Sequence, residues 1–113
     1  MGWISYEGIG EVAVTLGMLN SVEAGMPLTF LENDWVRPAR DGEKFCGVAM
    51  KRGGIVNAAQ VKGFVRVSYS GELSLGWNTL VANGQGGVRQ SNDGLMILVA
   101  EVDDEDYTAV FCL

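Results

Sequence analysis

The chain has 113 residues, of which 48% are hydrophobic and 19% are charged. This length suits one domain with a substantial core, and this balance excludes an intrinsically disordered chain. The sequence contains no histidine, which excludes Ser-His-Asp and Cys-His catalysis and His-ligated zinc sites. Its net charge of −6 repels phosphates, so nucleic acid is not expected as a partner.

The glycine content points to an all-β fold. Sixteen glycines against two prolines predict many tight turns rather than long helices. No stretch approaches the ~18 uninterrupted apolar residues of a transmembrane helix, so no membrane association is expected. The N-terminus lacks a secretory signal, which predicts synthesis in the cytoplasm. Cys46 and Cys112 lack metal-ligand spacing, and both are expected to be buried free thiols in a reducing compartment.

In chain order, the first half is expected to form four strands, at 11–16, 26–31, 35–37 and 45–50. Pro27 cannot donate a ladder hydrogen bond and therefore belongs at the first residue of a strand or on a sheet edge. Gly47 indicates a bulge or the close approach of another backbone. The run Lys51-Arg52-Gly53-Gly54 is typical of a hairpin tip.

The second half is expected to form five strands, at 60–68, 76–82, 88–89, 95–102 and 107–113. The run 55–60 (IVNAAQ) is the only one of helical composition. Because it is too short for a stable helix, we expect it to continue into the strand that follows. Turns rich in glycine or acidic residues separate the later strands, at 83–87, 92–94 and 103–106.

The two halves repeat each other at offsets of 51 or 52 residues (76 − 25 = 51; 80 − 28 = 52). The matched positions are turn glycines and apolar strand residues. They are Gly25 with Gly76, Leu28 with Leu80, Val36-Arg37 with Val88-Arg89, Asp41-Gly42 with Asp93-Gly94, and Val48-Ala49 with Val99-Ala100. We therefore expect a single domain with a short N-terminal arm (1–10) and two half-repeats (about 11–61 and 62–113). Their apolar faces would bury each other in one small closed β-barrel.

No residue is assigned to catalysis, to a cofactor or to a metal. Glu101 and the acidic run 103–106 offer oxygen ligands, but the glycine and the distant glutamate of an EF-hand loop are missing. A solvated hairpin tip is expected there instead. The run Gly84-Gln85-Gly86-Gly87 is not followed by the GK[ST] of a phosphate-binding loop, and we interpret it as a turn.

Arg37 and Arg89 occupy matching places in the two halves. Each could cap its own half through a bidentate salt bridge, to Asp41 or to Asp93 respectively. Such surface pairs contribute about 0–1 kcal/mol, so a structural role is favoured over a functional one.

Large apolar side chains are the candidates for partner binding. Trp3, Ile4 and Tyr6 precede the first half-repeat, where they either fold back on the core or anchor in a groove of a partner. Trp35 and Trp77 lie inside the half-repeats and are expected to pack in the core or at its rim. An aromatic residue at a strand end also suits an interface, and a sugar-binding platform is a further alternative.

Five segments together carry a resemblance to a known family. They are YEGIGEVAVTL, GMPLTF, DGEKFCGVAMKRGG, QVKGFVRVSYSG and NGQGGVRQSNDGLMILVAEVDDEDYTAVFCL. In these segments, which cover nearly the whole chain, the sequence resembles prophage-encoded head decoration, or capsid-stabilising, proteins of tailed bacteriophages. The resemblance implies a β-tulip or SH3-like barrel that joins the outside of the capsid after shell expansion, as trimers or monomers. It also implies that an N-terminal arm, here residues 2–10, pairs with the major capsid protein.

The expected function is therefore non-enzymatic decoration of a phage head, which is stabilised by bridging of major capsid protein subunits. The protein would act on the exterior of the virion after synthesis in the bacterial cytoplasm, with self-association as a trimer favoured. One alternative is a carbohydrate-binding or adhesion module that uses Trp35 or Trp77 and is displayed on a virion or a cell envelope. Another is a small enzyme that uses only carboxylates and backbone dipoles.

Overall fold

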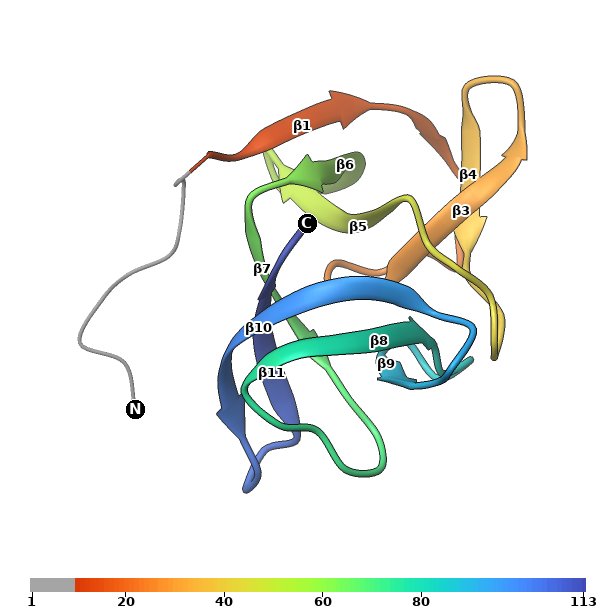
Figure 1. Ribbon diagram of the computed structural model, residues 1–113. Coiled ribbons are helices and arrows are strands. Elements are labelled where there is room, and N and C mark those ends of the chain that lie inside the picture. Colours follow the sequence, from red (N-terminus) through yellow and green to blue (C-terminus); the bar gives the residue numbers. More distant parts are fainter. Residues whose placement is uncertain (1–9) are drawn as a thin grey trace.

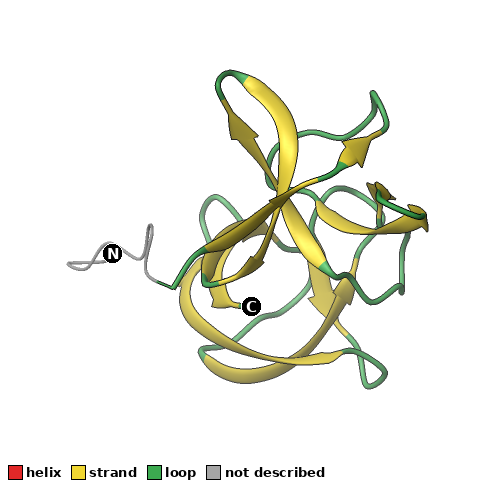
Figure 2. Ribbon diagram, turned by 90° about the horizontal axis from the view of Figure 1, so that it is seen from above, coloured by secondary structure: helices red, strands yellow, loops and turns green. Residues whose placement is uncertain are grey.

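A computed structural model describes residues 10–113, and every regular element in this part of the chain is a β-strand (Figure 2). The predicted all-β class is confirmed. Within these residues no helix could cross a membrane. The strands form two sheets, one from each half of the described chain (Figure 1).

The first sheet has the strand order β1-β6-β5-β3-β4-β2. Pro27 is the first residue of its strand, as predicted, because that position requires no ladder donor. Gly47 begins another strand, where a Cβ would lie 2.8 Å from the carbonyl oxygen of Gln60, so the predicted close approach is confirmed. The run 55–60 is strand, as expected. The elements are β1 (Val12–Thr15), β2 (Gly17–Met18), β3 (Pro27–Glu32), β4 (Trp35–Pro38), β5 (Gly47–Arg52) and β6 (Ile55–Lys62).

The second sheet has the strand order β7-β11-β10-β8-β9, and all its pairings are antiparallel. Apart from the run 60–68, each strand predicted in this half is found within a few residues of its expected bounds. The elements are β7 (Phe64–Ser68), β8 (Gly76–Ala82), β9 (Val88–Gln90), β10 (Leu95–Asp103) and β11 (Thr108–Cys112).

The chain passes from one sheet to the other at Gly63. A single strand over 60–68 was expected, but β6 ends at Lys62 and β7 begins at Phe64. Gly63 has a φ of 97°, which lies in the left-handed region that side chains other than glycine disfavour. The buried Gln60 holds this corner, since its Nε2 donates to the carbonyls of Lys62 and Phe64, both at 3.0 Å. This change of sheet at Gly63 lies next to the predicted boundary between the half-repeats, at about residues 61 and 62.

The two sheets have corresponding strand orders. The order β1-β6-β5-β3-β4 in the first sheet corresponds to β7-β11-β10-β8-β9 in the second, and the first sheet has one further strand, β2, beside β4. The registers of three strand pairs also correspond at offsets of 51 or 52 residues (81 − 29 = 52; 99 − 48 = 51). These pairs are Thr29–Arg37 with Val81–Arg89, Val48–Gln60 with Val99–Phe111, and Ala13–Gln60 with Val65–Phe111.

The first segment of each half, which is longer than its first strand, contacts both ends of its own sheet. Only Leu16 separates β1 from β2, yet β1 pairs with β6 and β2 pairs with β4. Tyr69, which directly follows β7, forms a parallel bridge to Val88 in β9. The strand pairings of residues 10–113 do not join the two sheets into one ladder, so the single closed barrel stays a prediction.

The described residues contain two apolar cores. The smaller core lies in the first half, around Leu28, Val36 and Ala59. The larger core fills the second half and also takes Ala39, Phe45 and Val48 from the first. The segment 39–46 therefore connects the halves: the Phe45 and Phe111 rings lie 6.2 Å apart, and Gly42 N–H donates to the Ala82 carbonyl at 2.9 Å.

Candidate interaction surfaces

The predicted partner-binding residues Trp3, Ile4 and Tyr6 lie outside the described residues, as does most of the arm over 1–10. The two other tryptophans are described, and neither belongs to a core. Trp35 is 44% exposed and Trp77 is 67% exposed, so the expectation of core packing was wrong for both. Their exposure leaves the rim and interface interpretations in place.

Trp77 belongs to a continuous apolar row on the outer face of the second sheet. It lies directly opposite Leu98, which lies opposite Cys112, which in turn lies opposite Phe64. Directly opposed residues share one face of a sheet. The alternating residues, such as Ile97 in β10, point into the larger core, so this row faces outward.

Two further side chains enlarge this row into a surface. Met96 is 65% exposed and lies on the same face of β10 as Leu98, two residues away. Leu75 precedes β8 and is also 65% exposed. We name Leu75, Trp77, Met96, Leu98, Cys112 and Phe64 the β8–β10 surface. Its aromatic and methionine side chains are types enriched at protein interfaces.

Sequence reasoning identified Trp77 in this surface but missed Met96 and Leu98. The run LMILVAEV at 95–102 is apolar at consecutive positions, which predicts a strand but not which side chains face outward. In an antiparallel sheet with one solvated face, such a strand should alternate with polar residues. The missing alternation is the signal that could have revealed an apolar outer face.

A second group of exposed apolar residues lies on the β3–β4 hairpin, which extends at the upper right of Figure 1. Phe30 and Leu31 are exposed near the end of β3, and Trp35 begins β4. The Trp35 ring packs against the backbone of Gly17, where a Cβ would lie only 2.5–2.8 Å from the ring atoms. This contact fixes one face of the indole and leaves the other available.

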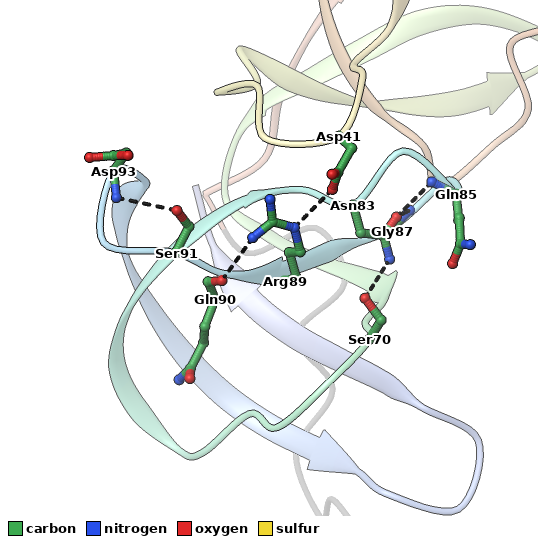
Figure 3. Close-up of polar contacts among 9 residues, drawn as sticks. All are labelled: Asp41, Ser70, Asn83, Gln85, Gly87, Arg89, Gln90, Ser91 and Asp93. Carbon is green, nitrogen blue, oxygen red and sulfur yellow. Dashed lines mark hydrogen bonds and ion pairs between the residues drawn. The ribbon is translucent and has the colours of Figure 1, made fainter.

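The predicted partners of the two arginines are wrong. Arg37 forms the expected bidentate pair, but with Glu43, at 2.8 and 2.9 Å rather than with Asp41. Arg89 Nε donates at 2.8 Å to Asp41 of the other half (Figure 3). Asp93 has no ion pair among the described residues. The reason is the path of the segment 39–46, which bonds to Ala82 and so carries Asp41 toward β9.

Glu43 is the carboxylate with the most complete set of donors. Hydrogen bonds from the Arg37 guanidinium, and then from the Arg40 backbone N–H at 2.6 Å, hold the pKa of Glu43 at about 2. In turn, the hydrogen bond to Glu43 raises the pKa of Arg37 above its ordinary value. The pair fixes the start of the connection between the halves and has a structural role.

The glycine-rich loop 83–87 is a turn, as predicted. Asn83 organises it, since its Oδ1 accepts from the backbone N–H groups of Gln85 at 2.8 Å and Gly87 at 3.0 Å (Figure 3). Asn83 Nδ2 donates to the Ser70 hydroxyl at 3.1 Å. Two backbone N–H groups of this loop therefore donate to a side chain of the loop itself, that of Asn83.

The acidic hairpin tip at 103–106 and Cys46 are the remaining places for which the sequence made a structural prediction. Asp103 Oδ1 accepts from the backbone N–H groups of Glu105 and Asp106, at 3.0 and 3.1 Å, so this carboxylate stabilises its own turn. Both cysteines are free, but Cys46 is exposed and Cys112 is only partly buried, so the prediction that both are buried was wrong. Its neighbour Phe45 enters the larger core, which directs the adjacent side chain outward.

An open cavity of about 500 Å³ lies beside the acidic tip in the second half. Tyr69 and Tyr107 form part of its wall, with ring centroids 5.7 Å apart. Glu72 and Asp104 both line the cavity and are exposed. We name this cavity the tyrosine pocket; its remaining lining residues are Gly71, Leu73, Ser74 and Gln90.

Comparison of the chain with protein-family models, with curated proteins and with solved structures finds no match.

Proposed function

We propose that this protein is a non-enzymatic capsid decoration protein that binds the outside of a phage head. The observation that carries the proposal is the β8–β10 surface. Trp77 and Met96 are each about two-thirds exposed there and continue into a half-buried apolar row across four strands. Exposed apolar surface of this kind is characteristic of protein interaction sites. The major capsid protein is the proposed partner, and the virion exterior the proposed location.

The neighbours of Trp77 favour a protein partner over a sugar. Its cross-strand partner is Leu98, and Met96 lies diagonally across from it. Sugar-binding sites need polar side chains that hydrogen-bond hydroxyl groups beside the aromatic ring. A carbohydrate-binding or adhesion module therefore remains the second candidate, supported by the exposure of Trp77 alone.

We also propose that the two sheets are half-repeats of one duplicated unit. Their strand orders and three strand registers correspond at the offset that the sequence predicted. The segment that begins each half contacts both ends of its sheet, through β1 and β2 in the first half and through β7 and Tyr69 in the second, which supports curling of each half toward a small barrel. A duplicated module presents two related surfaces to a shell, which suits the bridging of capsid subunits. Retention by many such contacts requires only modest affinity at each one.

The test mixes the purified protein with expanded, undecorated capsids and measures co-sedimentation and the temperature of capsid rupture. We expect binding to saturate and the rupture temperature to rise. Trp77→Ser should weaken binding about tenfold or more, because truncation of a central aromatic residue typically costs 2 kcal/mol or more at an interface. Ile55→Ser is the matched control, since Ile55 is 65% exposed but lies in the first sheet.

Absence of co-sedimentation together with an unchanged rupture temperature would contradict decoration. Equal effects of the Trp77 and Ile55 substitutions would contradict the choice of surface. Specific binding on a glycan array that Trp77→Ser abolishes would establish the carbohydrate alternative instead. Analytical ultracentrifugation of the same preparations tests the proposed trimer.

A further inference from the structure

The tyrosine pocket has an uncompensated negative charge. Glu72 and Asp104 line it, and the described residues of its lining include neither lysine nor arginine. Burial and the charge of Asp104 raise the pKa of Tyr69 above its ordinary value, and the charge of Asp103 adds to this effect. The chain as a whole also has a net charge of −6. The local and the overall field therefore both attract a cation.

The two tyrosines offer the pocket different groups. Tyr69 is only 6% exposed, lines the pocket, and its hydroxyl has no hydrogen-bond partner among residues 10–113. Among residues 10–113 the fully buried side-chain N and O atoms without a partner comprise Asn57 Oδ1 alone, so the Tyr69 hydroxyl is reached from the pocket and can accept a hydrogen bond from a ligand. Tyr107 is 56% exposed, which leaves part of its ring open to a ligand.

From this combination we propose that the tyrosine pocket receives the guanidinium group of an arginine side chain from a partner protein. A guanidinium is planar and weakly hydrated, so it stacks on an aromatic ring while its N–H donors reach carboxylates and a hydroxyl. An ammonium group is more strongly hydrated and lacks the planar fork. The pocket shares no residue with the β8–β10 surface, and the inference does not depend on a capsid as the partner.

The experiment is an NMR titration of the ¹⁵N-labelled full chain with N-acetyl-arginine amide. The matched ligand is N-acetyl-citrulline amide, which has nearly the same shape without the charge. We expect saturable shifts at Gly71, Ser74 and Tyr107, with a Kd of the order of 1–10 mM for so small a ligand. Citrulline should bind about tenfold more weakly or not at all, because charge-assisted hydrogen bonds are roughly twice as strong as neutral ones.

Two variants locate the site. Glu72→Gln removes one charge with little change in shape and should weaken binding several-fold. Tyr107→Asn removes the ring and should do the same; asparagine tolerates the left-handed backbone at this residue, where φ is 55°. Glu32→Gln, an exposed acid in the first sheet, is the control and should leave the Kd unchanged. Retained dispersion of the amide spectrum shows that each variant is folded.

Equal binding of the arginine and citrulline amides would overturn the inference, as would shifts spread over all exposed acidic residues. Tighter binding of free L-arginine than of its acetylated amide would assign the pocket to a small molecule and overturn the protein partner. Saturable shifts at the same amides with methyl glucoside, and none with arginine, would assign it to a sugar.

Discussion

Glu43 and Arg37 form a bidentate ion pair that lowers the pKa of Glu43. The folded-state pKa of Glu43, about 2, lies below its ordinary value of 4.5. Between these two pH values the unfolded chain binds more protons than the folded chain. The contribution of Glu43 to stability is therefore complete above about pH 4.5 and is lost as the pH falls toward 2.

We predict that Glu43→Gln destabilises the protein at pH 7 and that the difference from the parent chain shrinks as the pH falls toward about 2, where half of the folded-state Glu43 is protonated. Urea denaturation followed by circular dichroism over pH 2–7 measures it. Arg37→Gln and the double variant complete a double-mutant cycle, in which the coupling free energy should be clearly smaller at pH 2 than at pH 7. A coupling that does not change with pH would show that the pair is not electrostatic.

For single residues, the sequence predicted the strand positions of the two arginines better than it predicted their ion-pair partners. The matching places of Arg37 and Arg89 follow from a periodic pattern, and both residues lie at corresponding register positions. Their partners depend on the path of the segment 39–46, which is fixed by contacts with a strand some forty residues away. No local pattern contains that information, and for the same reason the exposure of Cys46 was not predicted.

Among the elements, the strands were predictable because β-branched runs and glycine turns are local features. There are two exceptions: the short strand β2 was not predicted, and in the run 60–68 the alternation of apolar residues continues through Gly63 although the chain changes sheet there. Gln60 is the residue that distinguishes a corner from a continuous strand. Its role depends on a buried amide that spans the break, which periodicity does not reveal.

We predict that Gln60→Leu destabilises the protein by about 1–3 kcal/mol, because the carbonyls of Lys62 and Phe64 each lose the hydrogen bond from its amide. Chemical denaturation measures the loss. Gln85→Leu is the control, since Gln85 is an exposed loop residue, and it should change stability by less than about 0.5 kcal/mol. A Gln60 variant as stable as the control would mean that Gly63 alone sets the corner.

In the molecule as a whole, the two sheets share packing, and they are joined by the corner at Gly63 and by the segment 39–46. The larger core depends on Ala39, Phe45 and Val48 from the first half, so neither half completes its packing alone. The surface ion pair of Arg89 with Asp41 contributes little beside this, since exposed pairs are worth about 0–1 kcal/mol. Phe45 is the largest of the three side chains and is 5% exposed, so cooperativity between the halves should depend mainly on it.

We predict that Phe45→Ala costs about 3–5 kcal/mol and uncouples the two halves. In the parent chain the slowest amide protons of β5 and β6 should exchange with the same opening free energy as those of β10 and β11, because both report global unfolding. In the variant the two values should separate, since the first sheet keeps its own core around Leu28 while the larger core has a cavity. Phe30→Ala, at a residue that is 54% exposed, should change neither value by more than about 0.5 kcal/mol. Equal values in both sheets of a destabilised Phe45 variant would show instead that the halves are held together by the backbone contacts of the segment 39–46 with Ala82.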